Sequence, residues 1–357
     1  MPKWRTVSVH VGKGYDVMIG GGLIADCGHL ISDELGGRCR AAVITDSNVE
    51  SLYLNSVMIS LEEAGLDAVC HIFPAGEENK NITTLWDILE FLAENHIGRG
   101  DIVIALGGGV TGDMAGFAAG VYLRGIRYVQ MPTTLLAAVD SSVGGKTAVD
   151  LNAGKNLAGV FKQPELVLCD THTLETLTDY DMANGMAEAI KTAVLFSHPL
   201  FDMFGGEMTP SVLADIIESC VRFKAHIVEI DERERNERRL LNLGHTIGHA
   251  IEKCSGYTVG HGHAVAAGMA MMCRAGEKMG ITELGTAYAV EETLERFGLP
   301  TNTDYTTDQL LEAALNDKKR SGDTITIVVP ETIGQCTMRT EPIDALARYI
   351  ELGRGRR

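Results

Sequence analysis

The stretch that decides the fold is DIVIALGGGVTGDMAGFAAGV, residues 101–121. It begins with the β-branched and aliphatic run Asp101–Leu106, which is typical of a buried strand. The glycine-rich run Gly107–Asp113 comes next, and a helical pattern covers Met114–Val121. Backbone amides in such a turn can reach a pyrophosphate, and the positive end of the helix dipole favours the same anion. Because the spacing G-x-G-x-x-G is absent, a plain strand-to-helix turn is the alternative interpretation.

Short β-branched runs on both sides of this stretch repeat the pattern of a strand followed by a helix. They cover Ala41–Thr45, Ala68–Phe73 and Arg127–Met131. Such alternation predicts βαβ units built around a parallel sheet.

The second half of the chain has a different pattern. From about Leu174 to Phe297 the apolar residues recur at helical spacing. Two late runs, Thr324–Val329 and Gln335–Arg339, predict a pair of strands with a turn near Pro330. This half is therefore predicted to be mostly α-helical.

Length and charge limit the class of the protein and its partners. A chain of 357 residues with 45% hydrophobic and 22% charged residues is globular and long enough for two domains. We predict an α/β nucleotide-binding domain over 1–172 and a mostly α-helical domain, which binds metal and substrate, over 173–357. The 48 acidic residues outnumber the 31 Lys and Arg, and the net charge of −17 disfavours nucleic acid and anionic membranes as partners. An anionic substrate would need a local cluster of cations.

The cysteines indicate a reducing compartment. Eight are scattered without a C-x-x-C pair, at positions 27, 39, 70, 169, 220, 254, 273 and 336. Most stand in apolar runs, as core thiols do. The first ten residues lack the basic-then-apolar pattern of a signal peptide, and no run of about eighteen apolar residues is present. We therefore expect a cytoplasmic protein that does not span a membrane.

Polar residues beside the predicted turns suit a nucleotide or a phosphate. Asp46 and Asn48 follow the first of the flanking strands, where an acid can hold ribose hydroxyls. A helix N-cap is the alternative role for Asp46. Lys146 and Lys155 each follow a glycine, in what we expect to be loops, and together they suit an anion. For either residue taken alone, a solvated surface lysine is the better interpretation. The P-loop pattern fails, because it requires glycine where this chain has Asp140.

Four polar residues recur at helical spacing in the second half. Arg238, Asn242, His245 and His249 stand at i, i+4, i+7 and i+11, so they would share one face of a continuous helix whose other faces are apolar. A surface helix would carry charged residues there instead of Asn and two His. We therefore expect this face to line a cavity.

Three further residues suit a metal site. His261 and His263 open the next helical pattern. Glu188 lies in the apolar helical run Met186–Lys191, where an unpaired acid is costly. Two histidines and one carboxylate are the ligands of an open, catalytic zinc site. For each histidine taken alone, a hydrogen-bonded core residue is the alternative.

With these residues in place, the chain resembles the 3-dehydroquinate synthase family of sugar-phosphate cyclases. The motifs that carry the resemblance run in order from about Asp46 to Lys319. They are GGGVTGD (107–113), RG (124–125), QMPTTLLAAVDSSVGGKT (130–147), GKN (154–156), MAEAIK (186–191), DERE (231–234), NLGHTIGHAIE (242–252), HGHAV (261–265) and DKK (317–319). The resemblance implies the fold of that family, an α/β domain with a parallel sheet and a helical domain, with a cleft between them.

The resemblance also implies two cofactors, NAD and Zn²⁺, with Co²⁺ as a substitute for zinc. The metal ligands would be Glu188, His245 and His261. The place of His261 before Gly262 in the family motif makes it the expected ligand. His263, where the family usually has Glu, is the alternative. The residues implied for NAD are Asp46, Asn48, Gly76, Glu77, Lys80, Gly109, Val110, Thr111, Gly112, Asp113, Thr133, Thr134, Lys146, Lys155, Thr173, Leu174, Glu175 and Thr176.

The substrate that the resemblance implies is a sugar phosphate, 3-deoxy-D-arabino-heptulosonate 7-phosphate. It would be converted to 3-dehydroquinate and phosphate in the shikimate pathway by transient oxidation with NAD, phosphate elimination, re-reduction, ring opening and aldol closure. Arg124 would reach the phosphate across a homodimer interface. The other residues implied around the substrate are Asp140, Lys146, Asn156, Lys191, Lys224, Glu234, Arg238, Asn242, His249 and Lys318.

Three alternatives remain at this point. The first is another cyclase, such as a 2-deoxy-scyllo-inosose or amino-dehydroquinate synthase, although the GKN and DKK motifs favour the dehydroquinate branch. The second is an iron-type alcohol dehydrogenase, which would release NADH in proportion to product. The third is a noncatalytic metal- or nucleotide-binding protein, which would bury many charged groups without use.

Overall fold

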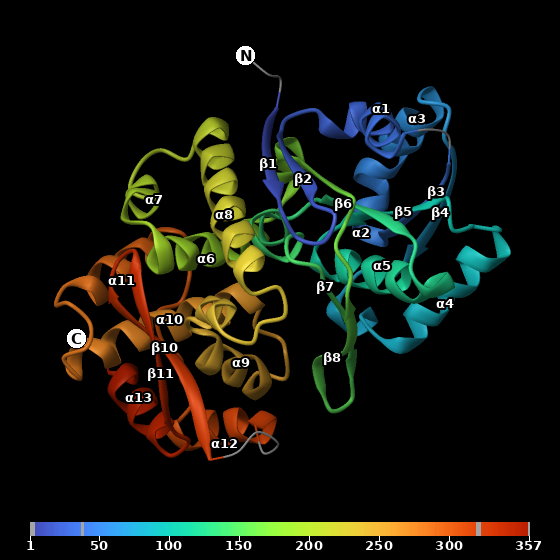
Figure 1. Ribbon diagram of the computed structural model, residues 1–357. Helices are drawn as coiled ribbons and strands as arrows, with labels where there is room; N and C mark the ends of the chain where they lie inside the picture. Colours follow the sequence, from blue (N-terminus) through green and yellow to red (C-terminus); the bar gives the residue numbers. More distant parts are fainter. Residues whose placement is uncertain (1–3, 37–38, 319–322, 356–357) are drawn as a thin grey trace. The chain divides into compact units, whose positions relative to one another are not determined.

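The computed structural model describes residues 4–36, 39–318 and 323–355, except the side chains of residues 316–318. Contacts within the chain divide it into two units (Figure 1). The first unit is the chain up to Leu177 together with Lys224–Arg233, and the second is Thr178–Phe223 together with the chain from Glu234 onward. Helix α8 (Pro210–Ile230) contributes residues to both. The domain limits 1–172 and 173–357 stay a prediction.

A mixed, mainly parallel sheet forms the centre of the first unit. Within the described residues it has seven strands in the order β1-β2-β9-β6-β5-β3-β4. Only the pairing of β1 with β2 is antiparallel, so the predicted parallel sheet is confirmed. The strands are β1 (Arg5–Val9), β2 (Tyr15–Gly20), β3 (Arg40–Asp46), β4 (Asp67–Phe73), β5 (Ile102–Gly107), β6 (Arg127–Pro132) and β9 (Leu166–Asp170).

Helices cover both faces of this sheet. Side chains alternate along β3, so that Ala41 and Val43 pack on one face while Ala42 and Ile44 pack on the other. The first face packs against α1 (Leu23–Leu35) and α3 (Asn55–Glu63), and the second against α4 (Ile82–Glu94) and α5 (Gly109–Val121). Burial on both faces explains why β3, β5 and β9 are nearly continuous apolar runs.

The strand order places a topological switch point between β3 and β5. From β3 the chain adds β4 on one side, and β5, β6 and β9 follow on the other. In open parallel sheets, ligands bind outside the carboxyl ends of the strands at such a point. In this unit the carboxyl ends of β3 and β5 carry Asp46 and the glycine-rich run.

A hairpin that the sequence patterns did not predict follows β6. It pairs β7 (Lys146–Leu151) with β8 (Gly154–Phe161) in an antiparallel manner. Lys146 and Lys155, which were expected in loops, therefore stand on strands. Shorter elements of the first unit are α2 (Ser47–Val49), the π-helical turns Glu50–Leu54 and Ala137–Ser141, and the 3₁₀ turns Glu77–Asn79, Tyr122–Arg124 and Thr171–Thr176.

The second unit is mostly helical, as predicted. Its helices are α6 (Asp179–Phe196), α7 (His198–Met203), part of α8, α9 (His245–Cys254), α10 (His261–Lys278), α11 (Thr286–Arg296), α12 (Thr307–Lys318) and α13 (Ala345–Arg354). The late strands are β10 (Thr324–Thr332) and β11 (Gln335–Pro342), paired antiparallel. The predicted turn near Pro330 is wrong, because Pro330 pairs with Cys336 inside the hairpin. The chain reverses at Gly334 instead, whose φ is +89°.

The predicted continuous helix through Arg238, Asn242, His245 and His249 is also wrong. Residues Glu237–Asn242 form a 3₁₀ helix, and α9 begins at His245. Gly244 between them has φ +76°, a left-handed conformation that ends one helix and starts another. Only His245 and His249 therefore share a helical face.

The cysteines are free thiols, as their scattered positions in the sequence predict. All eight cysteines are free, and Cys27, Cys169, Cys220 and Cys273 are buried. Burial raises the pKa of Cys169 and Cys273 to about 12, so both are protonated thiols at neutral pH.

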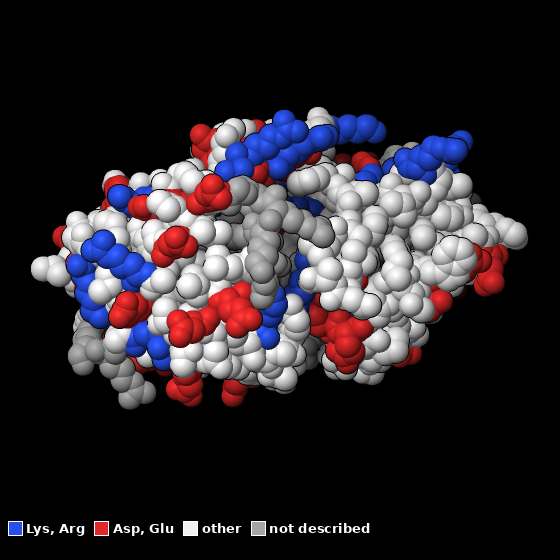
Figure 2. Space-filling model, turned by 90° about the horizontal axis from the view of Figure 1, so that it is seen from below, with Lys and Arg blue, Asp and Glu red and all other residues white. Residues whose placement is uncertain are grey.

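On the face drawn in Figure 2, Lys and Arg form separate small groups among acidic and uncharged side chains. In the described part of the chain, no helix is long and apolar enough to cross a bilayer.

Candidate active site

Close helix packing assembles the candidate metal ligands in the second unit. A Cβ on Gly248 of α9 would lie 3.1 Å from the Ala264 carbonyl of α10. A Cβ on Gly262 of α10 would lie only 2.1 Å from the Asn184 carbonyl of α6. Glycine at these positions lets the three helix backbones approach more closely than any side chain would permit. The three ligand candidates extend from these three helices.

Glu188 is a buried carboxylate whose oxygens could accept more hydrogen bonds than they do. Its side chain is 1% exposed, in the middle of α6. Oε2 forms an ion pair with Lys191, one turn along the helix, but neither carboxylate oxygen accepts a hydrogen bond of acceptable geometry from the described residues. A buried carboxylate is costly unless it is fully paired or coordinates a metal, and one ion pair leaves most of its lone pairs unused. The predicted burial of Glu188 is confirmed.

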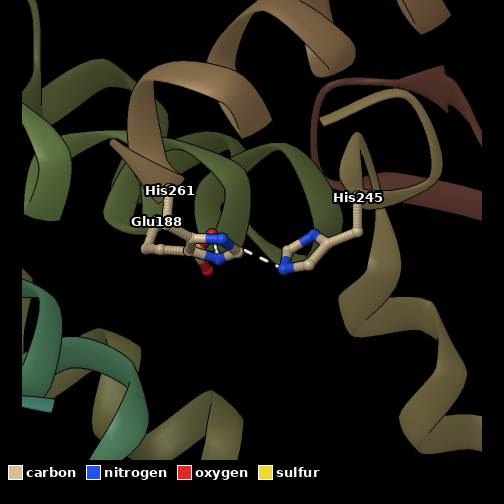
Figure 3. Close-up of side chains that lie close together, drawn as sticks. All are labelled: Glu188, His245 and His261. Atoms are coloured by element: carbon tan, nitrogen blue, oxygen red, sulfur yellow. Dashed lines mark ion pairs between the residues drawn. The ribbon is translucent and has the colours of Figure 1, made fainter. Parts of the chain in front are cut away.

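Two histidines face this carboxylate from the first residues of α9 and α10 (Figure 3). The Nε2 atoms of His245 and His261 each lie 3.8 Å from Glu188 Oε1. One ligand atom from each of the three residues lies within 4.8 Å of the others. Two imidazoles and one carboxylate are a donor set that suits Zn²⁺ or Co²⁺ and leaves coordination positions for a substrate.

The other ring nitrogens of these histidines also have partners. Nδ1 of His245 lies 3.1 Å from the Leu243 carbonyl oxygen, and Nδ1 of His261 lies 3.4 Å from Glu252 Oε2. Metal-binding histidines generally donate the second N–H to a carbonyl or a carboxylate, which fixes the tautomer and the ring orientation. Both rings are therefore oriented to present Nε2 to a metal ion beside Glu188.

His263 lies in a different environment. Its ring stacks on Tyr180 with the centroids 4.0 Å apart, and its Nδ1 lies 3.1 Å from Asn184 Oδ1. It belongs to neither group of described residues that could hold a metal ion. Partial burial lowers the pKa of His263. The geometry thus favours His261 over His263 as the ligand.

The electrostatic environment differs between the two candidate histidine ligands. Burial lowers the pKa of His245 well below its ordinary value, and the positive charge of Lys191 acts in the same direction. Burial alone would also lower the pKa of His261, but the hydrogen bond to Glu252 and the charge of Glu188 outweigh it and raise the pKa. His245 is therefore held neutral, and a bound cation would compete with a proton at His261.

Two residues implied for the substrate, Asn242 and His249, lie beside this cluster. A pocket of about 190 Å³ is lined by Asn242, His245, Thr246, His249, Ala250, Ala313, Ala314 and Thr326. His249 is 51% exposed, and its ring centroid lies 5.3 Å from that of His245. Asn242 Nδ2 donates to Glu234 Oε1 at 3.0 Å, and Arg238 is buried. The side chain of Lys318 lies outside the described residues.

In the first unit the glycine-rich run starts a helix. Helix α5 begins at Gly109, five residues before the predicted start, and its N-cap Gly108 offers no side chain to the first amides. A Cβ on Gly107 would lie 2.5 Å from Thr111 Oγ1, and one on Gly108 would lie 3.0 Å from Thr134 Cγ2. The Thr133 amide donates to the Gly107 carbonyl at 3.0 Å. A tight, uncapped helix N-terminus of this kind suits a phosphate group.

Asp46 links β3 to this turn. One carboxylate oxygen caps α2 by accepting from the amides of Asn48 and Val49, at 2.9 and 3.2 Å. The other accepts from the Thr111 hydroxyl at 2.9 Å. The N-cap role that was the alternative for Asp46 is thus present, and the same carboxylate contacts the glycine-rich helix start at the switch point.

A buried lysine connects residues implied for NAD with one implied for the substrate. Lys80 Nζ lies 2.6 Å from Asp113 Oδ2 and 2.6 Å from Asn156 Oδ1. Burial alone would lower the pKa of Lys80, but the charges of Asp113 and Glu77 outweigh it and raise the pKa, so Lys80 is charged at neutral pH. Asn156 adopts the left-handed φ of +55°, and its amide donates to Asp150.

The remaining predicted residues of this unit fall into separate groups. Lys155 pairs with Glu77 at 3.5 Å, beside Gly76, and buried Lys224 pairs with Asp140 at 2.8 Å. The hydroxyl of Tyr53 contacts Thr173 and Thr176, which flank Leu174 and Glu175. The predicted residues of this unit with exposed side chains are Asn48, Arg124, Lys146, Asn156, Glu175 and Thr176. The backbone of Arg124 has φ +69°.

Glu252 was not among the predicted site residues. It is 2% exposed on α9 and faces both His261 and His249. The signal that identified Glu188, an acid within an apolar helical run, applies equally to Glu252. Tyr53 was also not predicted, because its proximity to Thr173 depends on the packing of segments 120 positions apart.

Comparison with a solved structure identifies the class of protein to which this fold belongs. The 2-epi-5-epi-valiolone synthase from Streptomyces hygroscopicus, solved with NAD⁺ and Zn²⁺ bound, superposes with a TM-score of 0.88 at 26% identity, over 98% of both chains. The two-unit fold is thus that of the sugar-phosphate cyclases.

Sequence comparisons then give the family. Residues 70–184 match the model of the 3-dehydroquinate synthase N-terminal region and residues 185–320 that of its C-terminal region. The 3-dehydroquinate synthase of Sinorhizobium medicae is 44% identical over 95% of this chain and 93% of its own, and that of Clostridium acetobutylicum is 40% identical over 98% and 99%. The chain belongs to the 3-dehydroquinate synthase family. Its activity is that of a 3-dehydroquinate synthase, a phosphate-eliminating lyase of aromatic amino-acid biosynthesis. This activity excludes the other cyclases, the iron-type alcohol dehydrogenase and the noncatalytic binding protein raised from the sequence.

Proposed function

We propose that the chain converts 3-deoxy-D-arabino-heptulosonate 7-phosphate to 3-dehydroquinate and phosphate, with NAD and a divalent metal ion, Zn²⁺ or Co²⁺, as cofactors. The observation that carries the metal assignment is the buried Glu188 carboxylate. It pairs with Lys191 but accepts no hydrogen bond of acceptable geometry from the described residues, and its Oε1 lies 3.8 Å from Nε2 of both His245 and His261. Membership of the family supports the substrate.

The chemistry of this substrate requires both cofactors. The proton lost with the phosphate becomes acidic only beside a carbonyl group. Bound NAD supplies the hydride acceptor that creates this carbonyl and later returns the hydride, while the metal supplies a Lewis acid for the substrate hydroxyls. The chain's own residues then have to bind an anion, orient it and move protons.

Buried cations suit the anionic groups of the substrate. Lys191 and Arg238 in the second unit and Lys224 in the first are at most 7% exposed. Low dielectric strengthens the attraction between such groups and a phosphate or a carboxylate. These residues provide local positive charge against a net charge of −17. We assign the substrate role to them together with Arg124, Asp140, Lys146, Asn156, Glu234, Asn242, His249 and Lys318.

His249 is the proposed proton carrier of the second unit. Its exposed imidazole borders the pocket that contains Asn242 and the candidate ligand His245. Imidazole groups can accept and return a proton near neutral pH without a large energetic cost. Lys146, exposed at the start of β7, is the corresponding candidate of the first unit.

The NAD site is proposed at the carboxyl ends of β3 and β5. The uncapped start of α5 suits the pyrophosphate, and Asp46 and Asn48 suit a ribose. The full proposed set comprises those two residues with Gly76, Glu77, Lys80, Gly109–Asp113, Thr133, Thr134, Lys146, Lys155 and Thr173–Thr176. A homodimer and a cytoplasmic location complete the proposal, and both rest on the resemblance to the family.

Phosphate release tests this assignment. Protein freed of metal by a chelator and then supplied with NAD and Zn²⁺ or Co²⁺ should release phosphate from 3-deoxy-D-arabino-heptulosonate 7-phosphate. Glucose 6-phosphate is the matched sugar-phosphate control and should not react. Equal release from both sugars, or none from the heptulosonate in fully reconstituted protein, would contradict the proposed substrate.

A further inference from the structure

The two candidate histidine ligands use different acceptors for the ring nitrogen that faces away from Glu188. His245 Nδ1 contacts a neutral backbone carbonyl, that of Leu243, at 3.1 Å. His261 Nδ1 instead contacts the charged side chain of Glu252, at 3.4 Å. The Leu243 carbonyl would be present whatever residue stood at that position, because it belongs to the backbone. The Glu252 carboxylate is present only because this position is a glutamate.

Glu252 is buried beside two imidazoles. Its side chain is 3% exposed, and Oε2, the atom that faces His261, also lies 4.0 Å from Nε2 of His249. Burying a carboxylate is costly unless nearby donors compensate for the lost water. The ring N–H of His261 is one such donor. The rings of His249 and His261 have their centroids 5.8 Å apart, so the carboxylate lies at the edge of the histidine cluster.

The direction of the His261 ring follows from its two contacts. Nε2 faces Glu188 at 3.8 Å and Nδ1 faces Glu252 at 3.4 Å. A neutral imidazole carries one hydrogen and one lone pair on its two nitrogens. If Nδ1 donates its hydrogen to Glu252, the lone pair is at Nε2, on the side of Glu188 and His245.

We propose that Glu252 is a positioning residue for the metal site: it accepts the Nδ1–H of His261, fixes the tautomer with its lone pair at Nε2, and thereby strengthens metal binding. This inference rests on the proposed metal site of Glu188, His245 and His261. Glu252 acts through His261 and does not itself touch the metal. Carboxylates in this role typically change metal affinity about 10- to 100-fold.

A competing arrangement uses the same residues. His249, Glu252 and His261 also present ligand atoms within 4.8 Å of one another and form a second group that could hold a metal ion. In that arrangement Glu252 would be a ligand, and His261 would offer the lone pair of Nδ1. A neutral imidazole cannot offer lone pairs from both nitrogens, so His261 cannot serve both arrangements at once, and they differ in where the ion lies.

Cobalt titration distinguishes these roles. The affinity of metal-free protein for Co²⁺ is measured by competition with a chromophoric chelator in the wild-type chain, Glu252→Ala and Glu252→Gln. We expect one ion per chain throughout, a roughly 10- to 100-fold weaker affinity for Glu252→Ala, and a smaller loss for Glu252→Gln, whose amide oxygen still accepts from Nδ1–H. The visible Co²⁺ spectrum of Glu252→Gln should keep the wild-type intensity, because the ligands are unchanged.

A matched control separates positioning from a general loss of buried charge. Glu291 of α11 is 14% exposed and pairs with Arg274 at 2.6 Å in the same unit. Glu291→Gln should leave the affinity for Co²⁺ unchanged, and near-ultraviolet circular dichroism of each metal-free variant confirms that it is folded. The nearly isosteric Glu252→Gln keeps the test decisive if Glu252→Ala does not fold.

The outcomes separate the inference from the proposed function. Unchanged affinity in both Glu252 variants would overturn the inference while the metal site stands. A visible Co²⁺ spectrum of Glu252→Gln that differs from that of the wild-type chain would also overturn it and make Glu252 a ligand. If the wild-type chain binds no Co²⁺, the proposed metal site itself fails, and the inference fails with it.

Discussion

Replacing Gly262 with Ala tests how the fold brings the metal ligands together. Gly262 follows His261 in the first turn of α10 and packs against the Asn184 carbonyl of α6. The φ of Gly262 is outside the left-handed region, so alanine fits the local backbone. The new methyl group would, however, lie 2.1 Å from the Asn184 oxygen and 2.7 Å from the carbonyl carbon. Both obstacles are backbone atoms and cannot rotate away.

The size of the effect follows from these distances. The start of α10 must move about 1 Å from α6 to restore a contact of 3.0 Å. This shift carries His261 away from Glu188, whereas metal–ligand distances tolerate only about 0.2 Å. A misplacement of about 1 Å can lower a catalytic rate on the order of 100-fold, and we expect a loss of Co²⁺ affinity of similar size. Overpacking should also destabilise the metal-free protein by about 1–3 kcal/mol.

The assay is Co²⁺ binding by chelator competition, with urea unfolding of the metal-free protein measured in parallel. Gly206→Ala is the control in the same unit, because its new Cβ would meet only the Met203 carbonyl at an ordinary 3.6 Å. Gly206→Ala should change neither the affinity for Co²⁺ nor the free energy of unfolding. Wild-type affinity for Co²⁺ in Gly262→Ala would refute the reasoning that contact between α6 and α10 sets the position of His261.

Four further substitutions test individual residues. Glu188→Ala removes the anionic ligand, so metal analysis should find roughly a tenth or less of the wild-type zinc; full occupancy would mean that the carboxylate is not a ligand. His261→Ala should lose the metal and His263→Ala should keep it, and the reverse result would exchange their roles. Lys80→Met leaves the Asp113 carboxylate without its cation and should lower the free energy of unfolding by about 3 kcal/mol. Tryptophan fluorescence in urea reports this loss, because both tryptophans lie in the first unit; an unchanged midpoint would show that the pair does not stabilise it.

Much of the fold could be predicted because buried parallel strands leave a local signal. The runs at residues 41–45 and 127–131 correspond to β3 and β6, which are buried on both faces and therefore mostly apolar. The run at 68–73 corresponds to the edge strand β4, which is only partly buried. The helix break at Gly244 could not be predicted from spacing, which also fits one continuous helix. That break depends on tertiary contacts, because a Cβ on Gly244 would lie 2.7 Å from the Val265 carbonyl of α10.

The metal site could be predicted where the sequence places a charged residue in a segment that should be buried. Glu188 in an apolar helical run indicates a ligand or a pair from sequence alone. The choice between His261 and His263 needed the structure, because two histidines separated by one residue diverge at the start of a helix. His263 stacks on Tyr180, while His261 faces Glu188. The link from Lys80 to Asn156 joins residues 76 positions apart, which no local pattern reveals.

The central claim is a cycle in which NAD is required and is regenerated within each turnover. The most direct test follows phosphate release and absorbance at the nicotinamide band together, in protein supplied with Zn²⁺ and 3-deoxy-D-arabino-heptulosonate 7-phosphate. The account predicts that phosphate release stops when NAD is removed and resumes when it is restored, while the NADH signal stays near baseline over many turnovers. Phosphate release from protein stripped of NAD, or NADH accumulating in proportion to phosphate, would contradict it.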